Sequence, residues 1–318
     1  MLMLSEHDVD ALGLTPHDWR EAIHAVFARF ADGRVQVAPK SHLRPSPGEL
    51  LLSLPAVDLE RRYSACKWVN VVPSERSRGG PTVNSVIVLN DWRSGRPLAL
   101  IAADRLTAAR TAAMSAVAAR HYARPESERI GFVGCGVQAA SHFDALRDLF
   151  PGLRLATVVG RRIEAARAFA DGLRALGIEA RASEEPRDAV ADQDLVVTTV
   201  PNGLARPFLD ANWLANGAFV AAADLGRSWR RDGLAAFARV ITDEREQSVE
   251  LAREGQLVSG GPYEADLADI AAGRIPRPRD PAGRTLFAFS GHGAADLAGA
   301  ILIYEAALRR TAADTPLR

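Results

Sequence analysis

The 318-residue chain has little or none of several features that mark particular classes of protein. Its two cysteines, Cys66 and Cys135, form no CxxC pair and no Cys/His cluster with zinc-ligand spacing, so neither a disulfide framework nor a structural metal is expected. Lys+Arg and Asp+Glu both number 39, and without a basic excess nucleic acid is not an expected partner. No window approaches the roughly 18 continuous apolar residues of a membrane helix, and the first ten residues lack a signal-peptide pattern. We therefore expect a cytoplasmic protein with no membrane partner.

In its overall composition the chain is an ordinary globular protein. Hydrophobic residues make up 47% of the chain and charged residues 25%, which indicates neither disorder nor a fibrous repeat. At roughly 150 residues per domain, the length predicts two domains, or one large one, with enough apolar surface to bury a core.

The first third of the sequence predicts a helix followed by a small sheet. Over 15–31, Thr15 can cap a helix, Pro16 suits its first turn, and apolar residues recur at helical spacing. Between 36 and 100, short apolar runs are broken by Pro and Gly, which indicates a mainly antiparallel sheet with loops. The Ala-rich run over 104–122 then predicts a long helix that leads out of this sheet.

After Pro125 the pattern changes to strand, glycine-rich turn and helix, repeated. RIGFVG and LRLATVVG predict strands, and 137–149 and 163–176 predict the helices that follow them, which makes a βαβ unit. Three more short apolar runs suit a parallel sheet covered on both faces: 194–200, 218–224 and 239–243. The predicted fold class is α/β, with a doubly wound Rossmann domain beside a smaller α+β domain. A helix predicted at 294–309 is expected to close back on the smaller domain.

The run GCGVQA at 134–139 matches the G-x-G-x-x-G/A fingerprint of dinucleotide-binding turns, because it follows a predicted strand and opens a predicted helix. Gly134 suits the tight turn, and Gly136 lets the backbone approach a pyrophosphate without a Cβ clash. Val137 and Gln138 begin the helix, whose N-terminus offers free N–H donors to phosphates. A dinucleotide is therefore expected. The alternative is a tight turn between strand and helix that binds no ligand, because such a turn can have the same sequence.

The end of the second predicted strand bears on the choice of cofactor. NAD-preferring sites usually carry Asp or Glu there to accept the ribose 2′-OH, but this strand continues into Arg161 and Arg162. Two arginines can grip a 2′-phosphate, so NADP(H) is favoured and NAD(H) is the alternative. The same arginines can also simply decorate the start of a helix.

Further segments resemble the ornithine cyclodeaminase/μ-crystallin family in their order along the chain. They are ACKWVNVVP, GPTVNSVIVLNDWRSGRPLALI, LTAARTAAMSAVAARHYARP, GCGVQ, TTVPNG, AAADLG, TDEREQS and GHGAADLAGA. The resemblance implies a homodimer with a nicotinamide between two domains. Residues 1–122 and 294–318 would form the substrate-binding and dimerisation domain, and 123–293 the Rossmann domain. Members include ornithine and lysine cyclodeaminases, alanine dehydrogenases and reductases of cyclic ketimines.

The resemblance also implies roles for individual residues. Arg44, Lys67 and Arg110 would bind the substrate carboxylate, and Asp224 would handle a proton. Fixed cations beside a reacting Cα suit this chemistry, since Arg binds a carboxylate bidentately and Lys adds a point charge. Each cation can also be an ordinary surface residue, and Asp224 can also cap the segment after its strand.

On the cofactor side, the resemblance implies that Thr111 contacts the phosphates. Thr199 and Val200 of TTVPNG join the expected cofactor residues.

Two positions bear on the choice among family members. Cyclodeaminases typically carry a Glu where this chain has Leu52, and the role of that Glu is not transferred to Glu49, which lies nearby but on a different turn of the chain. His292 is a candidate acid or substrate contact because histidine titrates near neutral pH, although a lone histidine is more often a loop residue with its hydrogen bonds satisfied. The resemblance places the pocket walls in loops at 41–50, 74–81 and 225–232.

These observations lead to an expected reaction. The first hypothesis is an NAD(P)H-dependent reductase of a small cyclic α-imino acid, such as Δ1-pyrroline-2-carboxylate or Δ1-piperideine-2-carboxylate, that yields the L-amino acid. Asp224 or Lys67 would supply the proton. The alternatives are an ornithine or lysine cyclodeaminase that recycles its cofactor, an amino-acid dehydrogenase or condensing synthase, and a non-catalytic protein that binds NADPH and a ligand.

Overall fold

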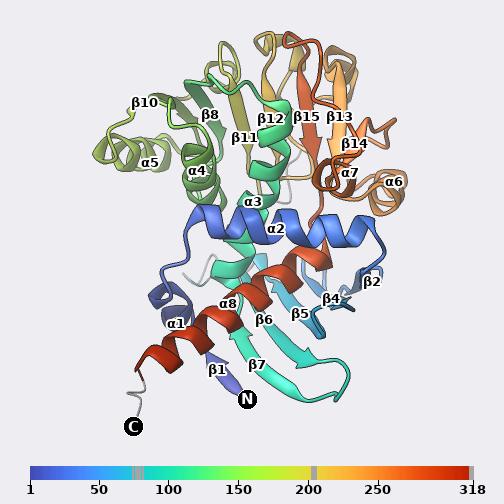
Figure 1. Ribbon diagram of the computed structural model, residues 1–318. Coiled ribbons are helices and arrows are strands. Elements are labelled where there is room, and N and C mark those ends of the chain that lie inside the picture. The colour runs from blue at the N-terminus through green and yellow to red at the C-terminus, as the bar shows by residue number, and fades with distance from the viewer. Residues whose placement is uncertain (74, 76–79, 81, 202–205, 315–318) are drawn as a thin grey trace. The chain divides into compact units, whose positions relative to one another are not determined.

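The computed structural model describes residues 1–73, 75, 80, 82–201 and 206–314 (Figure 1). The chain divides into two compact units, of which the first comprises Met1–Arg110 with His292–Arg318 and the second comprises Thr111–Gly291. The sequence predicted the first boundary at 122/123, because the helix there reads as one continuous run. The structure places 111–122 in the second unit, where Ala112 and Ala116 pack against Ala145.

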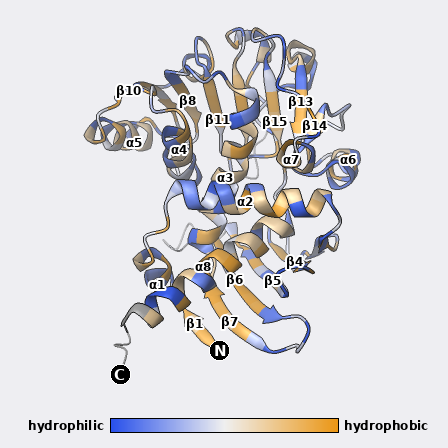
Figure 2. Cartoon of the chain, viewed as in Figure 1, coloured by the Kyte–Doolittle hydropathy of each residue, from blue (hydrophilic) through white to orange (hydrophobic). Residues whose placement is uncertain are grey.

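The first unit contains a seven-stranded sheet in the order β1-β7-β6-β5-β4-β2, with β3 beside β4. Its pairs are antiparallel except for β1 with β7, and this confirms the mainly antiparallel sheet. Figure 2 shows the hydrophobic character of β6 and β7. The strands are β1 (Leu2–Leu4), β2 (Val35–Val37), β3 (Ser41–Leu43), β4 (Leu50–Asp58), β5 (Tyr63–Val71), β6 (Val83–Asp91) and β7 (Pro97–Ala102).

Helices α1 (Glu6–Ala11), α2 (Pro16–Ala31) and α8 (Gly293–Asp314) complete the first unit. Thr15 caps α2 as predicted, with its hydroxyl accepting from the Asp18 N–H. Helix α8 packs on β4, β5 and α2, so the C-terminal helix returns to the first sheet. Burial on its inner side is nearly complete, and this core fixes the side chains of the site described below.

The second unit is a doubly wound parallel sheet in the order β10-β9-β8-β11-β12-β15-β13-β14. Every pair is parallel, and the strand order reverses between β8 and β11, which is where such sheets bind ligands. The α/β fold class is confirmed. The strands are β8 (Arg129–Val133), β9 (Leu155–Val159), β10 (Glu179–Ser183), β11 (Leu195–Thr198), β12 (Phe219–Ala222), β13 (Arg239–Thr242), β14 (Ala265–Asp266) and β15 (Thr285–Ala288).

The helices of the second unit include α3, which begins in the first unit, and several short 3₁₀ turns. They are α3 (Asp104–Tyr122), α4 (Val137–Leu149), α5 (Ile163–Ala175), α6 (Arg245–Arg253), α7 (Leu267–Ala271), η2 (Pro186–Ala189), η3 (Ala211–Trp213) and η4 (Arg231–Ala236).

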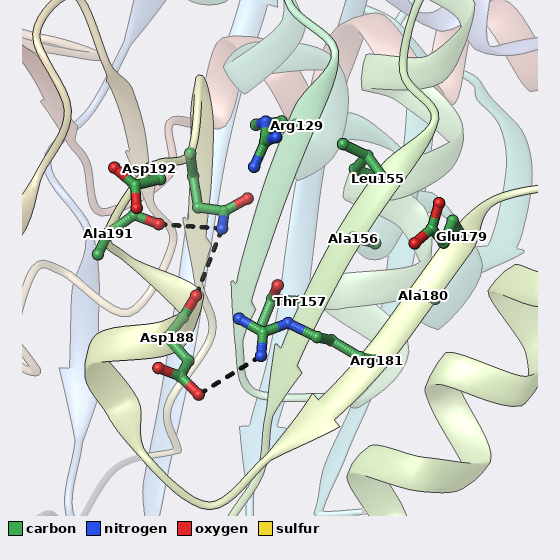
Figure 3. Close-up of a pocket in the computed structure, with 11 residues that line it drawn as sticks. Arg129, Leu155, Ala156, Thr157, Glu179, Ala180, Arg181, Asp188, Ala191 and Asp192 are labelled. Carbon is green, nitrogen blue, oxygen red and sulfur yellow. Dashed lines mark hydrogen bonds and ion pairs between the residues drawn. The ribbon is translucent and has the colours of Figure 1, made fainter.

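Only η2 connects β10 to β11, where a βαβ crossover usually carries a full helix. A cavity of about 380 Å³ lies there, lined by residues of β8, β9 and β10 (Figure 3). Arg181 approaches Asp188 to 3.7 Å, and the Gln193 amide donates to the Asp188 and Ala191 carbonyls. Its strand residues come from the first three positions of β9 and β10, so the cavity lies away from the carboxyl ends that hold ligands.

Candidate active site

A buried cluster of two cations and one carboxylate lies inside the first unit. The Lys67 ammonium donates to Oδ1 of Asp296 at 2.7 Å, and Arg110 Nε lies 2.9 Å from the same oxygen. The side chains of Lys67, Arg110 and Asp296 are 2%, 8% and 1% exposed. Thr107 Oγ1 lies 3.5 Å from Lys67 Nζ. The structure therefore brings together two of the predicted carboxylate-binding residues, on a partner that the sequence did not identify.

The secondary structure explains why these side chains meet. Lys67 alternates with the exposed Trp68 along β5, so it points to the helix-covered face of the sheet. Arg110 lies on the Ala-rich α3. Asp296 lies in the first turn of α8, where the helix dipole favours a carboxylate. In sequence alone, Asp296 is an ordinary acidic residue near a helix start.

Burial sets the electrostatics of the cluster. Burial, followed by the Arg110 charge, lowers the pKa of Lys67 to about 8, while Asp296 acts to raise it. Burial acts to raise the pKa of Asp296, but Arg110 and Lys67 outweigh it and hold that pKa below its usual value. Two cations and one anion leave one net positive charge, and Oδ2 of Asp296 has no hydrogen-bond partner in the described part of the chain. A lysine ammonium and an arginine guanidinium are the groups with which proteins bind carboxylates.

Lys40, which the sequence did not single out, also acts on this cluster. The charge of Lys40 contributes to the pKa values of both Lys67 and Asp296. Arg44 is exposed and makes no hydrogen bond or ion pair with the described residues. The β2–β4 and β3–β4 registers differ by one residue, because Val37 pairs with Ala56 but Ser41 with Ser53. This shift reverses which residues face the site, and sequence spacing does not reveal it.

One sequence signal was available for Lys40. The chain has 37 arginines and two lysines, and those lysines are Lys40 and Lys67. A chain that uses arginine for every other basic position has a chemical reason to keep lysine at these two.

The structure also shows the surroundings of His292 and Leu52, the two residues that bear on the choice among family members. His292 is 4% exposed and packs against Phe27 and Phe30, with ring centroids 5.6 Å and 4.9 Å away. Leu52 pairs with Val69 and His42 within the sheet. Of the predicted wall loops, most of 74–81 lies outside the described residues.

The glycine-rich turn of the second unit lies at the switch point of its sheet. Gly134 has φ +110°, a conformation that favours glycine, and a Cβ there would overlap the Thr199 hydroxyl. The position therefore needs both the backbone freedom of glycine and its lack of a Cβ. Gly136 caps α4 without a side-chain hydrogen bond, and a Cβ built on it meets nothing within 4 Å. Thr199 Oγ1 is buried without a hydrogen-bond partner among the described residues. This space, with an orphaned hydroxyl and free helix N–H groups, fits a phosphate.

The other predicted cofactor residues come from three parts of the second unit. Val137 is 66% exposed at the start of α4, and the amide oxygen of Gln138 is buried without a partner in the part that the structure describes. Val200 is half-buried just after β11, and Thr111 is buried on α3.

Arg161 and Arg162 are exposed between β9 and α5. Burial raises the pKa of the Cys135 thiol while the Arg162 charge opposes it, so Arg162 lies beside the glycine-rich turn. A contact of these arginines with the cofactor ribose stays a prediction.

Asp224 lies two residues beyond β12 and is 4% exposed. Its Oδ1 accepts from the Thr198 hydroxyl at 2.8 Å and from the Gly226 N–H at 3.1 Å, and its Oδ2 accepts from the Ser228 hydroxyl at 2.7 Å. Burial raises its pKa, against these hydrogen bonds. The carboxylate therefore anchors the turns directly after β12, where the described chain has no helix for it to cap.

The profile of the ornithine cyclodeaminase/mu-crystallin family matches residues 1–311. The chain belongs to this family. The resemblance inferred from the sequence is confirmed, and the family's match extends through α8 with Asp296. No helix among the described residues has the length and hydropathy needed to cross a bilayer.

Members of the ornithine cyclodeaminase/mu-crystallin family with different activities resemble this chain. The Δ1-pyrroline-2-carboxylate reductase of Bacillus cereus is 28% identical, over 81% of this chain and 82% of its own. A structure of the Thermococcus litoralis Δ1-pyrroline-2-carboxylate reductase with NADH and L-proline has a TM-score of 0.88 at 26% identity, covering 98% of both chains. An archaeal alanine dehydrogenase dimer with bound NAD has a TM-score of 0.87 at 28% identity, covering 98% of this chain and 97% of its own.

Proposed function

We propose that the protein is an NAD(P)H-dependent reductase of a small α-imino acid, such as Δ1-pyrroline-2-carboxylate or Δ1-piperideine-2-carboxylate, that forms the L-amino acid. The buried cluster of Lys67, Arg110 and Asp296 carries this proposal, because it places an ammonium and a guanidinium side by side, and these are the groups that bind a carboxylate. The two similar pyrroline-2-carboxylate reductases support it.

In this proposal Arg110 and Lys67 bind the substrate carboxylate, and Lys40 adds to the positive potential. This arrangement fixes the C=N carbon for hydride transfer. Arg44, predicted for the same task, is not needed for the cluster.

The reaction also needs a proton for the imine nitrogen. Lys67, with a pKa of about 8, is mostly protonated at neutral pH yet close enough to neutrality to act as a general acid. Asp224 is the second candidate, since burial raises its pKa, but three hydrogen bonds stabilise its ionised form. We therefore assign the proton to Lys67.

The second unit would hold the dinucleotide, which supplies the hydride when bound. Gly134, Gly136, Val137 and Gln138 would surround the pyrophosphate, with the orphaned Thr199 hydroxyl within the same turn region. Thr111 and Val200 were assigned to this site by the family resemblance.

We infer a preference for NADPH from Arg161 and Arg162, although the similar structures hold NADH or NAD. Replacing both arginines by serine should weaken NADPH use by at least about tenfold, since two charge-assisted contacts are lost, and leave NADH use nearly unchanged. Equal loss with both cofactors would contradict this role.

We also infer a homodimer built on the outer face of the first sheet. Trp68 pairs with Val86, and Cys66 with Val88, and three of these side chains are 38–41% exposed: Trp68, Val86 and Val88. An exposed apolar sheet face of this kind commonly forms a protein–protein interface. Light scattering should give twice the chain mass for the wild type and the chain mass for Trp68→Glu.

The similarity to alanine dehydrogenase favours one second candidate, an amino-acid dehydrogenase that works with free ammonia. A cyclodeaminase is disfavoured by Leu52, since no acid stands where a side-chain amine would be held.

The first experiment mixes purified protein with NADPH or NADH and a panel of cyclic imino acids and follows the nicotinamide absorbance. Rapid oxidation without ammonia supports the reductase. If the cofactor is oxidised in the presence of pyruvate only when ammonia is added, the dehydrogenase replaces the reductase. If ornithine or lysine releases ammonia without net oxidation of the cofactor, the cyclodeaminase replaces it.

A further inference from the structure

Asp296 occupies the junction of the two buried cations, and neither the family resemblance nor the proposed reaction gives it a role. One oxygen, Oδ1, serves both Lys67 at 2.7 Å and Arg110 at 2.9 Å. The three side chains come from β5, α3 and α8, so a single carboxylate joins the sheet to two helices.

We propose that Asp296 is a positioning residue that keeps Lys67 protonated and holds it beside Arg110, so that the two cations act as one anion-binding and proton-donating unit. The catalytic consequence rests on the proposed reductase function, whereas the protonation of Lys67 does not.

The charges around Lys67 explain why one carboxylate matters so much. Arg110 of α3 and Lys40 before β3 both act against the ammonium, as does burial. The neighbouring strands contribute no charge at the paired positions, where β4 presents Leu54 and β6 presents Ile87. Asp296 of α8 supplies the negative charge among the main contributions to the pKa of Lys67.

Without the Asp296 charge, a buried ammonium would face two like charges in a site of low polarity. It would release its proton near neutral pH, and a neutral amine neither attracts a carboxylate nor donates a proton to an imine. Arg110, too, would lose the partner that fixes its guanidinium, which weakens its use in orienting a substrate.

The scarcity of lysine allows a direct test. Protein grown with lysine labelled with ¹³C at Cε gives two side-chain resonances, from Lys40 and Lys67, and the Lys40→Arg variant assigns them. We expect Lys67 of the wild type to titrate near pH 8. In Asp296→Asn the midpoint should fall by about one to three pH units, as for the loss of a close opposite charge, while Lys40 moves far less.

The activity assay gives a second readout. If Lys67 must be protonated, kcat/KM falls at alkaline pH, and in Asp296→Asn this fall should begin at lower pH by the shift seen in the resonance. Activity of the variant should therefore recover toward that of the wild type at pH 6. Asp296→Glu, which keeps the charge, should retain a Lys67 midpoint closer to the wild-type value.

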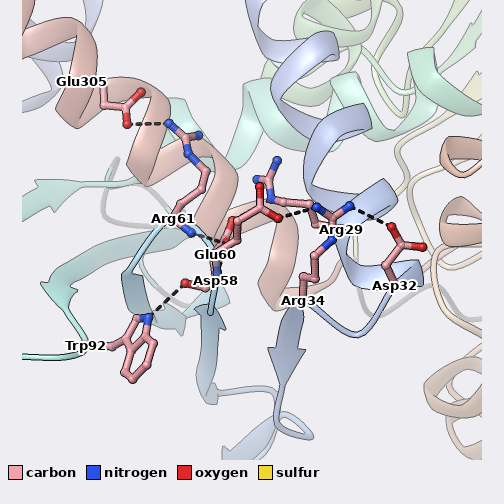
Figure 4. A network of polar contacts seen from close by, with 8 residues as sticks. All are labelled: Arg29, Asp32, Arg34, Asp58, Glu60, Arg61, Trp92 and Glu305. Carbon is pink, nitrogen blue, oxygen red and sulfur yellow. Dashed lines mark hydrogen bonds and ion pairs between the residues drawn. The ribbon is translucent and has the colours of Figure 1, made fainter.

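Asp58→Asn is the matched control. Asp58 is a buried carboxylate of the same unit that pairs with Arg29 at 2.9 Å and belongs to a separate polar network that includes Trp92 (Figure 4). Its loss should leave the Lys67 midpoint and the alkaline limb unchanged, so it separates general destabilisation from the specific effect.

Several outcomes would overturn the proposal. A Lys67 midpoint that does not move in Asp296→Asn, or activity that is reduced equally at every pH, assigns Asp296 a purely structural role. If both Asp296 variants fail to fold, a wild-type Lys67 that titrates below pH 7 still refutes it. If the wild type reduces no imino acid, the proposed function fails while the titration of Lys67 still decides the protonation role.

Discussion

Replacement of Lys67 by methionine is the most informative perturbation of the site. The substitution removes an ammonium but keeps a side chain of similar length. Asp296 retains Arg110 at 2.9 Å, so no buried carboxylate is left unpaired. We therefore expect the free energy of unfolding at pH 7 to fall by no more than about 1 kcal/mol, or to rise, since an ammonium is no longer desolvated.

The kinetic effect should be much larger than the effect on stability. Loss of a general acid lowers kcat by about 10²- to 10⁴-fold, and loss of one charged contact to a carboxylate, worth about 1.5–3 kcal/mol, raises KM by about tenfold or more. The assay is steady-state reduction of Δ1-pyrroline-2-carboxylate, with thermal unfolding measured on the same preparations. Lys67→Arg, which keeps the charge but does not release a proton, should restore KM more than kcat. Full turnover by Lys67→Met would refute both roles of Lys67.

The same variant tests the electrostatics without turnover. In the folded protein the pKa of Lys67 is lowered to about 8 from 10.5. Between these values the unfolded chain binds more protons than the folded one, so wild-type stability should gain with pH across this window, and the penalty is fully present below pH 8. The unfolding free energy of the wild type should therefore rise relative to that of Lys67→Met from pH 8 to pH 10. A constant difference would contradict a buried, depressed ammonium.

Other predictions concern the second unit. Gly136→Ala should fold normally, because its Cβ meets no protein atom, yet bind NADPH at least about tenfold more weakly in fluorescence titrations; unchanged affinity would remove the turn from the cofactor site. Gly134→Ala should instead lower stability by at least about 1 kcal/mol, since φ is +110° and Thr199 blocks the Cβ, and a normal melting temperature would contradict this geometry. Asp224→Asn should cost about 1–3 kcal/mol of stability through its contacts with Thr198 and Ser228 but keep kcat within about tenfold of the wild type, and a larger loss of kcat would return the proton to Asp224.

Local patterns predicted most of the fold. The helix over Asp104–Tyr122 follows from its alanine content and its lack of Gly and Pro, and the antiparallel strands follow from short apolar runs rich in Val, Ile or Leu, all of which are local properties of the sequence. Strand β1 was not predicted, because three residues carry little pattern and its pairing with β7 joins distant parts of the chain. The short η2 was also missed, since nothing in its composition shows that the crossover lacks a full helix.

The site was predictable only in part, for a related reason. Lys67 and Arg110 were identified because the family motifs include them, and each lies on a regular element. Lys40 was missed because its position depends on a one-residue register shift between β2 and β3. Asp296 was missed because its importance comes from a contact with a strand far away in sequence.

The near-absence of lysine gives this protein an unusual chemical consequence. Reagents that acylate amines can modify Lys40, Lys67 and the N-terminus, and a protease specific for lysine has two cleavage points. Lys67 is 2% exposed and Lys40 half-buried, whereas Met1 is 71% exposed, so acylation of the folded protein reaches the N-terminus first and Lys40 before Lys67. Protection of these amines by a candidate compound, read by peptide mass after digestion, would therefore serve as a binding assay that needs neither a chromophore nor turnover. Coupling the folded protein to a surface through its amines would attach it mainly by the exposed N-terminus.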